Sequence, residues 1–341
     1  MKKLLAVLLV LVMCLSLMAC QKNDDSDNTI PQKPTTEETS PKETEPEETE
    51  PEETEPEQES AVTPLLYKVS DEAGNVIWLF GSIHVGVEEY YPLPDYVLDA
   101  FRGSDALAVE ANIVAFEKDL AGQVNMLKKM VYTDGTNIKD HLSEETYQRA
   151  VEILKENSLY SAAYDAYYPV LWWNLIDNAA VMQADVDAEL GIDRYMIELA
   201  EDEDKQILEV ESAEFQYDML ASFSQELQVY LLEMVIEGYE QDLLVPEIYE
   251  LVTLWGEGNE ESFQAYLNAQ EEFESEAEAL LYQEYNDALI VSRNEAMTEY
   301  AVDALESGEE LFICVGAAHV IGEGAMAENL RALGYTVEIV R

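Results

Sequence analysis

Two of the three histidines in this 341-residue chain share the same short sequence context. His84 and His319 each have a glycine three positions earlier, and an apolar run precedes that glycine in both cases. With 15 glycines in the chain, a given histidine meets this condition only about 4% of the time, so chance explains two cases poorly. Such apolar runs predict strands buried on both faces. Each imidazole is therefore expected just past a core strand, where open α/β sheets place catalytic groups.

Two converging imidazoles can hold a divalent metal ion or act in acid–base catalysis, and a metal site needs at least one carboxylate more. Glu110 is the first candidate, because it also follows a short apolar run. Glu209 ends a strand-like stretch in the middle of the chain and is the second. Arg293 could bind a carboxylate or a developing oxyanion. Two alternatives stay open, namely Glu110 as a helix-capping acceptor and a buried ion pair between Glu209 and Arg293.

The other residues that could do chemistry are better explained by structure. His141 lacks the glycine context and precedes an expected helix, so we expect an ordinary loop residue. Trp172 and Trp173 lie in a helical pattern, which favours core packing over a substrate groove. Cys314 falls within a buried strand, where a lone cysteine behaves as a small apolar residue.

The elements that must position these residues follow from periodicity and turn signals. The predicted strands span 67–69, 76–83, 105–109, 205–211, 311–315 and 335–340. Residues from about 116 to 301 are otherwise helical in pattern, with few glycines. The sequence therefore predicts an α/β fold with a central, mostly parallel sheet. That sheet is built from the N- and C-terminal segments, with a large helical insertion between them.

The first 60 residues are expected to lie outside this fold. Residues 1–20 have the charge and apolar pattern of a signal peptide and end in a stretch that resembles the bacterial lipobox, which makes Cys20 the lipidation candidate. An uncleaved anchor helix is the alternative. Residues 21–60 are rich in Thr, Glu and Pro and contain almost no large apolar side chain, which predicts a disordered acidic tether. Residues 61–341 remain as the predicted α/β domain. A lipidated Cys20 implies a bacterial protein anchored in the cell membrane, on its extracytoplasmic side.

The charge of the chain limits its partners. Its formal net charge is −54, and residues 1–60 contribute −10 of this, which leaves −44 for residues 61–341. So acidic a surface argues against binding nucleic acid and against direct adsorption to anionic lipid.

From residue 65 to the end, the chain resembles the TraB/GumN family, which includes the Tiki metalloproteases and is distantly related to erythromycin esterases and ChaN-like proteins. The matching blocks are residues 79–86, 91–94, 105–110, 190–193, 207–212, 293–294 and 315–319. The resemblance implies a metal-dependent hydrolase whose site is formed by the two motif histidines, a glutamate and an arginine.

These observations lead to one working hypothesis and two alternatives. The hypothesis is a lipid-anchored metallohydrolase that cleaves peptides or proteins. His84, His319 and Glu110 would hold Mn²⁺, Co²⁺ or Zn²⁺, Arg293 would stabilise the oxyanion, and Glu209 would orient a ligand or transfer a proton. The alternatives are a protein that sequesters a peptide or small ligand without cleaving it, and a metal-independent esterase that uses the same residues.

Overall fold

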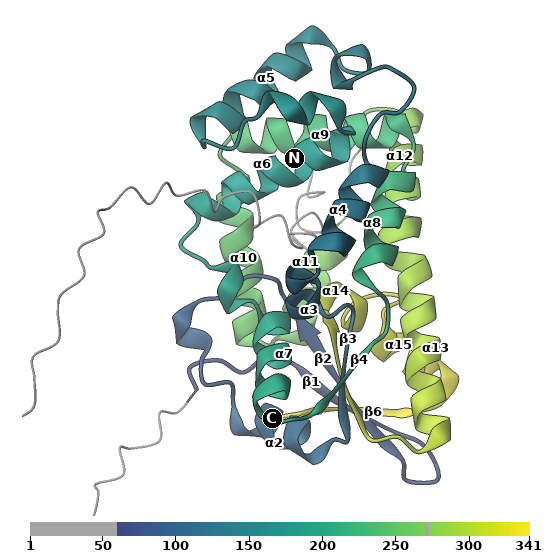
Figure 1. Cartoon of the computed structure of the whole chain (residues 1–341). Coiled ribbons are helices and arrows are strands. Elements are labelled where there is room, and N and C mark those ends of the chain that lie inside the picture. Colours follow the sequence, from purple (N-terminus) through teal and green to yellow (C-terminus); the bar gives the residue numbers. More distant parts are fainter. Residues whose placement is uncertain (1–59, 270–272) are drawn as a thin grey trace, which may run out of the picture.

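The computed structural model describes residues 60–269 and 273–341 (Figure 1). The predicted signal peptide, the predicted lipidation site Cys20 and the predicted tether up to residue 59 lie outside the described residues. Within the described part, no helix combines the length and the apolar character needed to cross a bilayer. The described residues correspond to the predicted α/β domain.

A six-stranded sheet with the strand order β4-β3-β5-β2-β1-β6 forms the base of the fold. The strands are β1 (Leu66–Ser70), β2 (Val76–Ser82), β3 (Ala106–Val109), β4 (Gln206–Glu209), β5 (Leu311–Gly316) and β6 (Thr336–Val340). The strands β2, β5, β3 and β4 run parallel, whereas β1 pairs antiparallel with β2 and with β6. Strands from both ends of the described chain thus lie side by side, which confirms the predicted fold class.

Helices fill the rest of the described chain. The α-helices are α2 (Asp95–Gly103), α3 (Ile113–Lys118), α4 (Leu120–Lys129), α5 (Glu144–Glu156), α6 (Pro169–Gln183), α7 (Ile192–Asp202), α8 (Ala213–Ser222), α9 (Gln225–Glu240), α10 (Leu244–Glu257), α11 (Glu260–Leu267), α12 (Glu276–Asn286), α13 (Ser292–Ser307), α14 (Ala317–Val320) and α15 (Met326–Leu333). Short 3₁₀ helices are η3 (Glu88–Tyr90), η4 (Ile138–Asp140), η5 (Ala162–Ala166) and η6 (Ala188–Leu190), and η7 (Asp287–Val291) is a π-helix.

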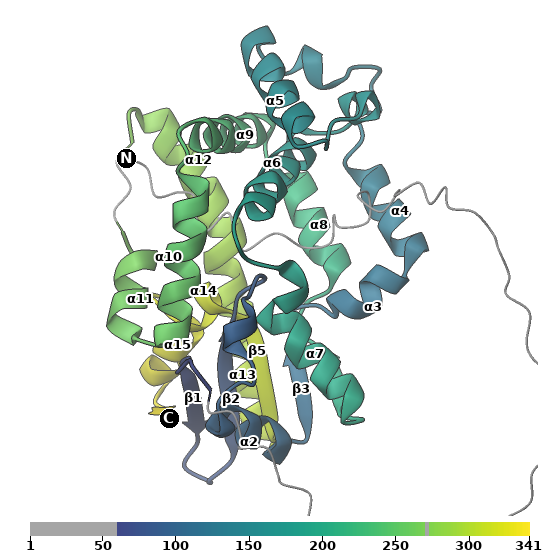
Figure 2. The same ribbon diagram turned by 90° about the vertical axis from the view of Figure 1, so that its left-hand side faces the viewer.

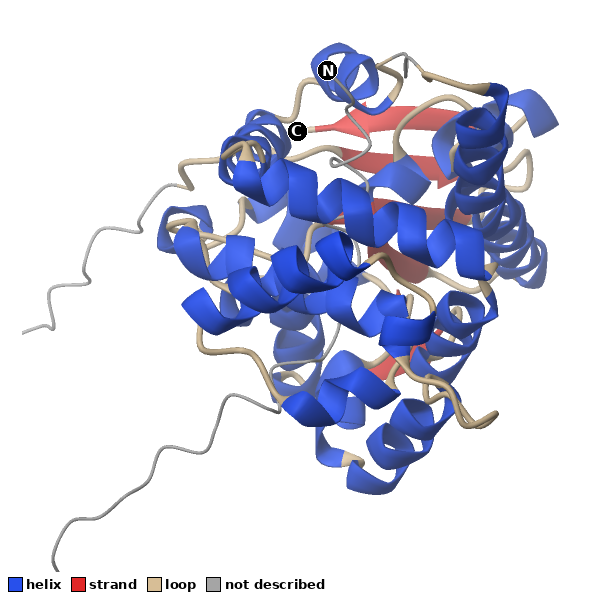
Figure 3. Ribbon diagram, turned by 90° about the horizontal axis from the view of Figure 1, so that it is seen from above, coloured by secondary structure: helices blue, strands red, loops and turns tan. Residues whose placement is uncertain are grey.

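The predicted helical insertion is present between β3 and β5, with β4 as its one strand among the described residues. In Figure 1, α5, α6 and α9 form a layer at the end of the molecule away from β1 and β6, and Figure 2 shows the same layer from the side. Seen from above, helices lie over the strands (Figure 3). Trp172 and Trp173 of α6 are fully buried, so the packing interpretation of these two indoles is confirmed.

The central strands are buried because their side chains are apolar on both faces. Every residue of β3 and of β5 is buried, as expected for parallel strands covered on both sides. The ring of Phe312 in β5 lies 5.6 Å from that of Phe80 in β2 and 5.7 Å from that of Phe101 in α2, measured between centroids. This aromatic contact fixes β2 against β5, the two strands that precede His84 and His319.

Gly81 is required for the close approach of β2 to α14. A Cβ at this position would lie 2.9 Å from the Cα of Ala317, which real Cβ atoms do not tolerate. Its carbonyl oxygen also accepts a hydrogen bond of 2.7 Å from the indole of Trp255 in α10. The glycine of the first motif thus has a packing role beneath the second motif.

We therefore expect Gly81→Ala to lower the free energy of unfolding by about 2 kcal/mol, because either β2 or α14 must move. Urea denaturation followed by circular dichroism measures this loss. Gly103→Ala is the matched control: no atom lies within 4 Å of a Cβ at Gly103, at the end of α2. The control should be neutral or stabilising by about 0.5–1 kcal/mol. Equal stability of the two variants would contradict the packing argument.

Candidate functional site

The residues predicted to act together meet at the carboxyl edge of the parallel strands. His84 follows β2, Glu110 follows β3, and His319 lies in α14 directly after β5. The Nε2 atom of His319 lies 3.8 Å from Oε1 of Glu110, and His84 is close enough to influence the pKa of both groups. The expected convergence of the two ends of the folded chain is therefore present in the structure. The role of these residues as metal ligands stays a prediction.

His319 is held in one tautomer by Asn294, which lies in α13. Its Nδ1 atom is 2.7 Å from Oδ1 of Asn294. The amide nitrogen of Asn294 donates to the carbonyl of Gly324, so its oxygen faces the imidazole and accepts from Nδ1–H. The lone pair of the neutral ring is consequently on Nε2, the atom that faces Glu110.

His84 is held in the same way by Asp193, near the start of α7. The distance from Nδ1 of His84 to Oδ2 of Asp193 is 2.6 Å, and both side chains are buried. Because a carboxylate only accepts, Nδ1 is the donor in this contact. Gly191 permits this approach, since a Cβ there would lie 2.8 Å from the carbonyl oxygen of His84 and 3.0 Å from Oδ1 of Asp193. Carboxylate and amide partners at Nδ1 are typical of imidazoles that serve as metal ligands or bases.

Glu110 is the centre of a buried polar network. Its Oε2 atom accepts from Nη2 of Arg293 at 2.7 Å, and its Oε1 atom accepts from the backbone N–H of Gly316 at 2.5 Å. Arg293 also binds Glu211 with Nε and Nη2 at 2.9 and 2.8 Å. Gln216 donates to both carboxylates at 3.1 Å. The single guanidinium of Arg293 thus binds two buried carboxylates, those of Glu110 and Glu211. The two negative charges exceed its one positive charge.

The environment sets the charges of Glu110 and His319. Burial raises the pKa of Glu110, but the opposing charge of Arg293, followed by the imidazoles and the Gly316 amide, lowers it to about 2. Burial and then the charge of Arg293 lower the pKa of His319 to about 3, although Glu110 opposes this shift. At neutral pH the carboxyl is therefore ionised and the imidazole neutral.

This combination leaves two acceptors facing each other. Nε2 of His319 is fully buried and has no hydrogen-bond partner in the part of the chain that the structure describes. Its lone pair faces the ionised Glu110, and two buried acceptors are stable together only when a donor or a cation lies between them. An imidazole nitrogen and a carboxylate oxygen suit a divalent ion chemically. Residues 60–269 and 273–341 nevertheless contain no group of three or more His, Cys, Asp or Glu side chains arranged to hold an ion.

Arg293 lies just after an irregular helical turn. The π-helix η7 connects α12 to α13, and Nη1 of Arg293 donates to the carbonyl of Leu289 within it at 3.3 Å. Short π-helical turns are frequent at functional sites. Here the turn aims the guanidinium at Glu110 and Glu211.

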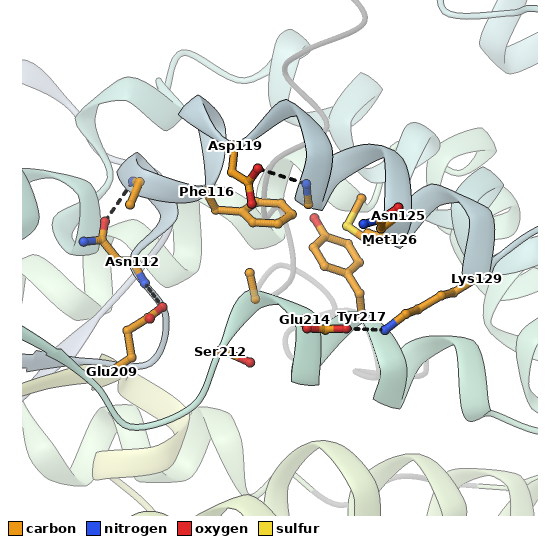
Figure 4. Close-up of a pocket in the computed structure, with 13 residues that line it drawn as sticks. Asn112, Phe116, Asp119, Asn125, Met126, Lys129, Glu209, Ser212, Glu214 and Tyr217 are labelled. Carbon is orange, nitrogen blue, oxygen red and sulfur yellow. Dashed lines mark hydrogen bonds and ion pairs between the residues drawn. The ribbon is translucent and has the colours of Figure 1, made fainter.

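The structure separates Glu209 from Arg293. Glu209 accepts the backbone N–H of Asn112 at 2.8 Å and lines a surface pocket (Figure 4). The alternative of an ion pair between Glu209 and Arg293 is therefore wrong, because Arg293 binds Glu110 and Glu211 instead. The helix-capping alternative for Glu110 is wrong as well: the cap of α3 is Asn112, whose side chain accepts from the Ala115 N–H.

His141 lies away from this network, as the sequence predicted. Its ring stacks on Tyr132 with centroids 4.3 Å apart and an interplanar angle of 3°, and its Nε2 atom is 2.9 Å from the hydroxyl of Thr136. These contacts explain the residue structurally.

The fold and the site define the class of protein to which this chain belongs. It is an α/β protein with a buried His–Glu–Arg site at the carboxyl edge of its sheet, assembled from both ends of the chain. The sequence model of the TraB/PrgY/gumN family matches residues 65–339 of the chain, and the chain therefore belongs to that family.

Comparison with known proteins finds two relatives, both described as uncharacterized. The chain is similar to the uncharacterized protein YbaP of Escherichia coli (strain K12), with 25% identity over 260 residues, which cover 74% of this chain and 87% of YbaP. The same values hold for YbaP of Shigella flexneri. No solved structure matches the chain.

The low pKa of His319 predicts a pH dependence of stability. In the unfolded chain the imidazole of His319 has its ordinary pKa of 6.5, whereas in the folded protein its pKa is about 3. Between these two pH values the unfolded chain therefore binds one proton more than the folded protein. This contribution to the free energy of unfolding is fully present above about pH 6.5 and is lost as the pH falls, by up to about 1.4 kcal/mol per pH unit. Urea unfolding of the chelator-treated protein between pH 7 and pH 5 measures the slope. His319→Gln should flatten it, whereas His141→Gln should not. Equal slopes for the wild-type protein and His319→Gln would contradict the assignment.

Proposed function

We propose that the protein is a hydrolase, with peptides or proteins as substrates, that works through His84, His319 and Glu110. The observation that carries the proposal is the buried Nε2 lone pair of His319, which faces an ionised Glu110 and accepts no hydrogen bond from any residue that the structure describes. A purely structural histidine would direct both ring nitrogens at partners. The chain also belongs to the TraB/PrgY/gumN family, and the resemblance to this family implies a hydrolase, which supports the same proposal.

The contacts suggest a role for each residue. Asp193 and Asn294 fix the orientation of the two rings, and the neutral ring of His319 has a basic Nε2 atom for taking a proton from water. Arg293 holds Glu110 in its charged form and in one orientation. Because its guanidinium is already directed at two carboxylates, we assign it a positioning role in place of the predicted oxyanion contact.

The chemistry of the donor atoms also fits a divalent metal ion. The residues that would hold Mn²⁺, Co²⁺ or Zn²⁺ are His84, His319 and Glu110, which together offer two imidazoles and one carboxylate. Because the described side chains are not grouped as an ion site, binding would require these three to move closer together. When bound, the ion would supply a Lewis acid and a more acidic water molecule. The excess negative charge of the buried network, two carboxylates on one guanidinium, favours a cation at this place.

The proposal also includes a location. A lipidated Cys20 would hold the hydrolase on the outer face of a bacterial cell membrane, and residues 21–60 would separate the folded domain from the lipid surface. Such a location matches peptide or protein substrates outside the cell.

Metal binding is directly testable. Titration of the purified protein with Mn²⁺, Co²⁺ or Zn²⁺ by calorimetry should show one site, and His84→Ala or His319→Ala should weaken it at least 100-fold through the loss of one ligand. His141→Ala is the matched control, because it removes the third histidine outside the site. Equal affinity of His319→Ala and His141→Ala would exclude His319 as a ligand.

Cleavage is tested by mass spectrometry of a defined peptide mixture after incubation. We expect cleavage by the wild-type protein and a loss of about 10²–10⁴-fold for Glu110→Gln, which preserves size but removes the charge. Circular dichroism confirms that the variant folds. Peptides that bind but stay intact would favour the sequestering alternative. Turnover that persists in a chelator would favour the metal-independent esterase.

A further inference from the structure

A cavity that the proposed chemistry does not use lies next to the segments that follow β3 and β4. It has a volume of about 380 Å³ and is bounded by α3 and α4 on one side and by the end of β4 with α8 on the other. Figure 4 shows Glu209 at one end and the ion pair of Lys129 with Glu214 at the other. Phe116 and Tyr217 face each other in between.

Two residues that line the pocket are close in sequence to members of the Glu110 network. Asn112, which lines the pocket, is two residues after Glu110, and Ser212, which also lines it, follows Glu211 directly. Two residues of chain span at most about 7 Å. The pocket and the candidate site are therefore neighbours in the fold, joined by the backbone that follows β3 and β4.

The charges in the pocket are unbalanced. Lys129 is already neutralised by Glu214 at 2.7 Å and by Asp218 at 2.6 Å. Glu209 and Asp119 accept only backbone N–H groups, from Asn112 and Gly122, and neither forms an ion pair with any residue that the structure describes. Among the described residues, the two carboxylates on the pocket wall thus have no cationic side chain as partner, although Asp119 also caps the start of α4.

The rest of the wall is apolar and aromatic. The rings of Phe116 and Tyr217 are stacked with centroids 5.9 Å apart and an interplanar angle of 28°, and Met126 lies next to them. Such walls cover the methylene stem of a long side chain, while ring faces and carboxylates attract its positive end. The net charge of −44 for residues 61–341 draws cationic ligands toward the protein as a whole.

We propose that this pocket selects a positively charged group of the peptide substrate, through the carboxylates of Glu209 and Asp119. The group is a lysine or arginine side chain, or the ammonium group at the N-terminus of the peptide. The inference rests on the proposed function and specifies its substrate. It also gives Glu209 a specificity role in place of the predicted catalytic one.

Peptide binding, without any measurement of cleavage, tests this proposal. The probes are fluorescein-labelled alanine hexapeptides, N-acetylated, with a central lysine, norleucine or glutamate, and an all-alanine peptide with a free N-terminus and the dye at its C-terminal end. Fluorescence polarisation at low salt in a chelator compares them on the full-length protein. We expect the lysine peptide to bind about tenfold more tightly than the norleucine peptide, because the two share a stem and differ in charge.

Glu209→Gln should reduce the preference for lysine to about twofold and leave norleucine binding unchanged. The variant keeps an oxygen acceptor for the Asn112 N–H, so the loop is preserved. Asp119→Asn, which keeps an acceptor for the Gly122 N–H, should act in the same direction. Glu152→Gln, an exposed residue of α5 outside the pocket, removes the same charge and should retain the full preference.

The outcomes distinguish a lysine side chain from an N-terminal ammonium group as the bound cation. They also separate the pocket proposal from the hydrolase proposal. Tighter binding of the free N-terminus than of the acetylated lysine peptide assigns the pocket to the N-terminal ammonium group. Equal affinity for lysine and norleucine, equal weakening of both by Glu209→Gln, or no binding of the lysine peptide up to about 1 mM overturns the pocket assignment. His319→Ala should retain the lysine preference, so a failure of the hydrolase proposal leaves this test intact.

Discussion

The buried carboxylate of Glu110 is the interaction on which the site depends. Through Oε2 it binds the guanidinium of α13, and through Oε1 it binds the amide of Gly316 at the start of α14. It thereby joins the end of β3 to the end of β5 and to the helical insertion. A charge this deep is tolerated only while Arg293 and the amide compensate it, so the contacts that stabilise the fold are also those that place Glu110 beside His319.

The convergence of His84, Glu110 and His319 could be predicted from the sequence because it requires only that each residue follows a parallel strand of one sheet. Apolar runs before His84, Glu110 and His319 predicted core strands, and parallel strands must end at one edge of a sheet. No side-chain geometry was needed for that step. The predictions for residues 1–59 concern a part of the chain that the structure does not describe.

The partner of Arg293 could not be predicted in the same way. β4 ends at Glu209, but the pairing with β3 continues past it, and the N–H of Glu211 donates to the carbonyl of Glu110 at 2.8 Å. Glu211 therefore lies next to Glu110, although it lies beyond the end of β4; the predicted strand 205–211 included Glu211 but gave no reason to prefer it over Glu209 as the partner of Arg293. The Nδ1 partners Asp193 and Asn294 come from helix starts, and only tertiary packing decides which helix start meets which ring. The sequence blocks contained these residues without indicating their contacts.

The position of β5 has a consequence for how the protein is made. This strand lies between β3 and β2 in the middle of the sheet, yet it is formed by residues 311–316, close to the end of the chain. Until those residues leave the ribosome, β2 and β3 lack their common neighbour, and the backbone edges that pair with β5 have no partner strand. The sheet therefore cannot close progressively during synthesis, and a chain that stops short of β5 would lose both the central strand and one of the two histidines. Folding of this architecture requires an essentially complete polypeptide.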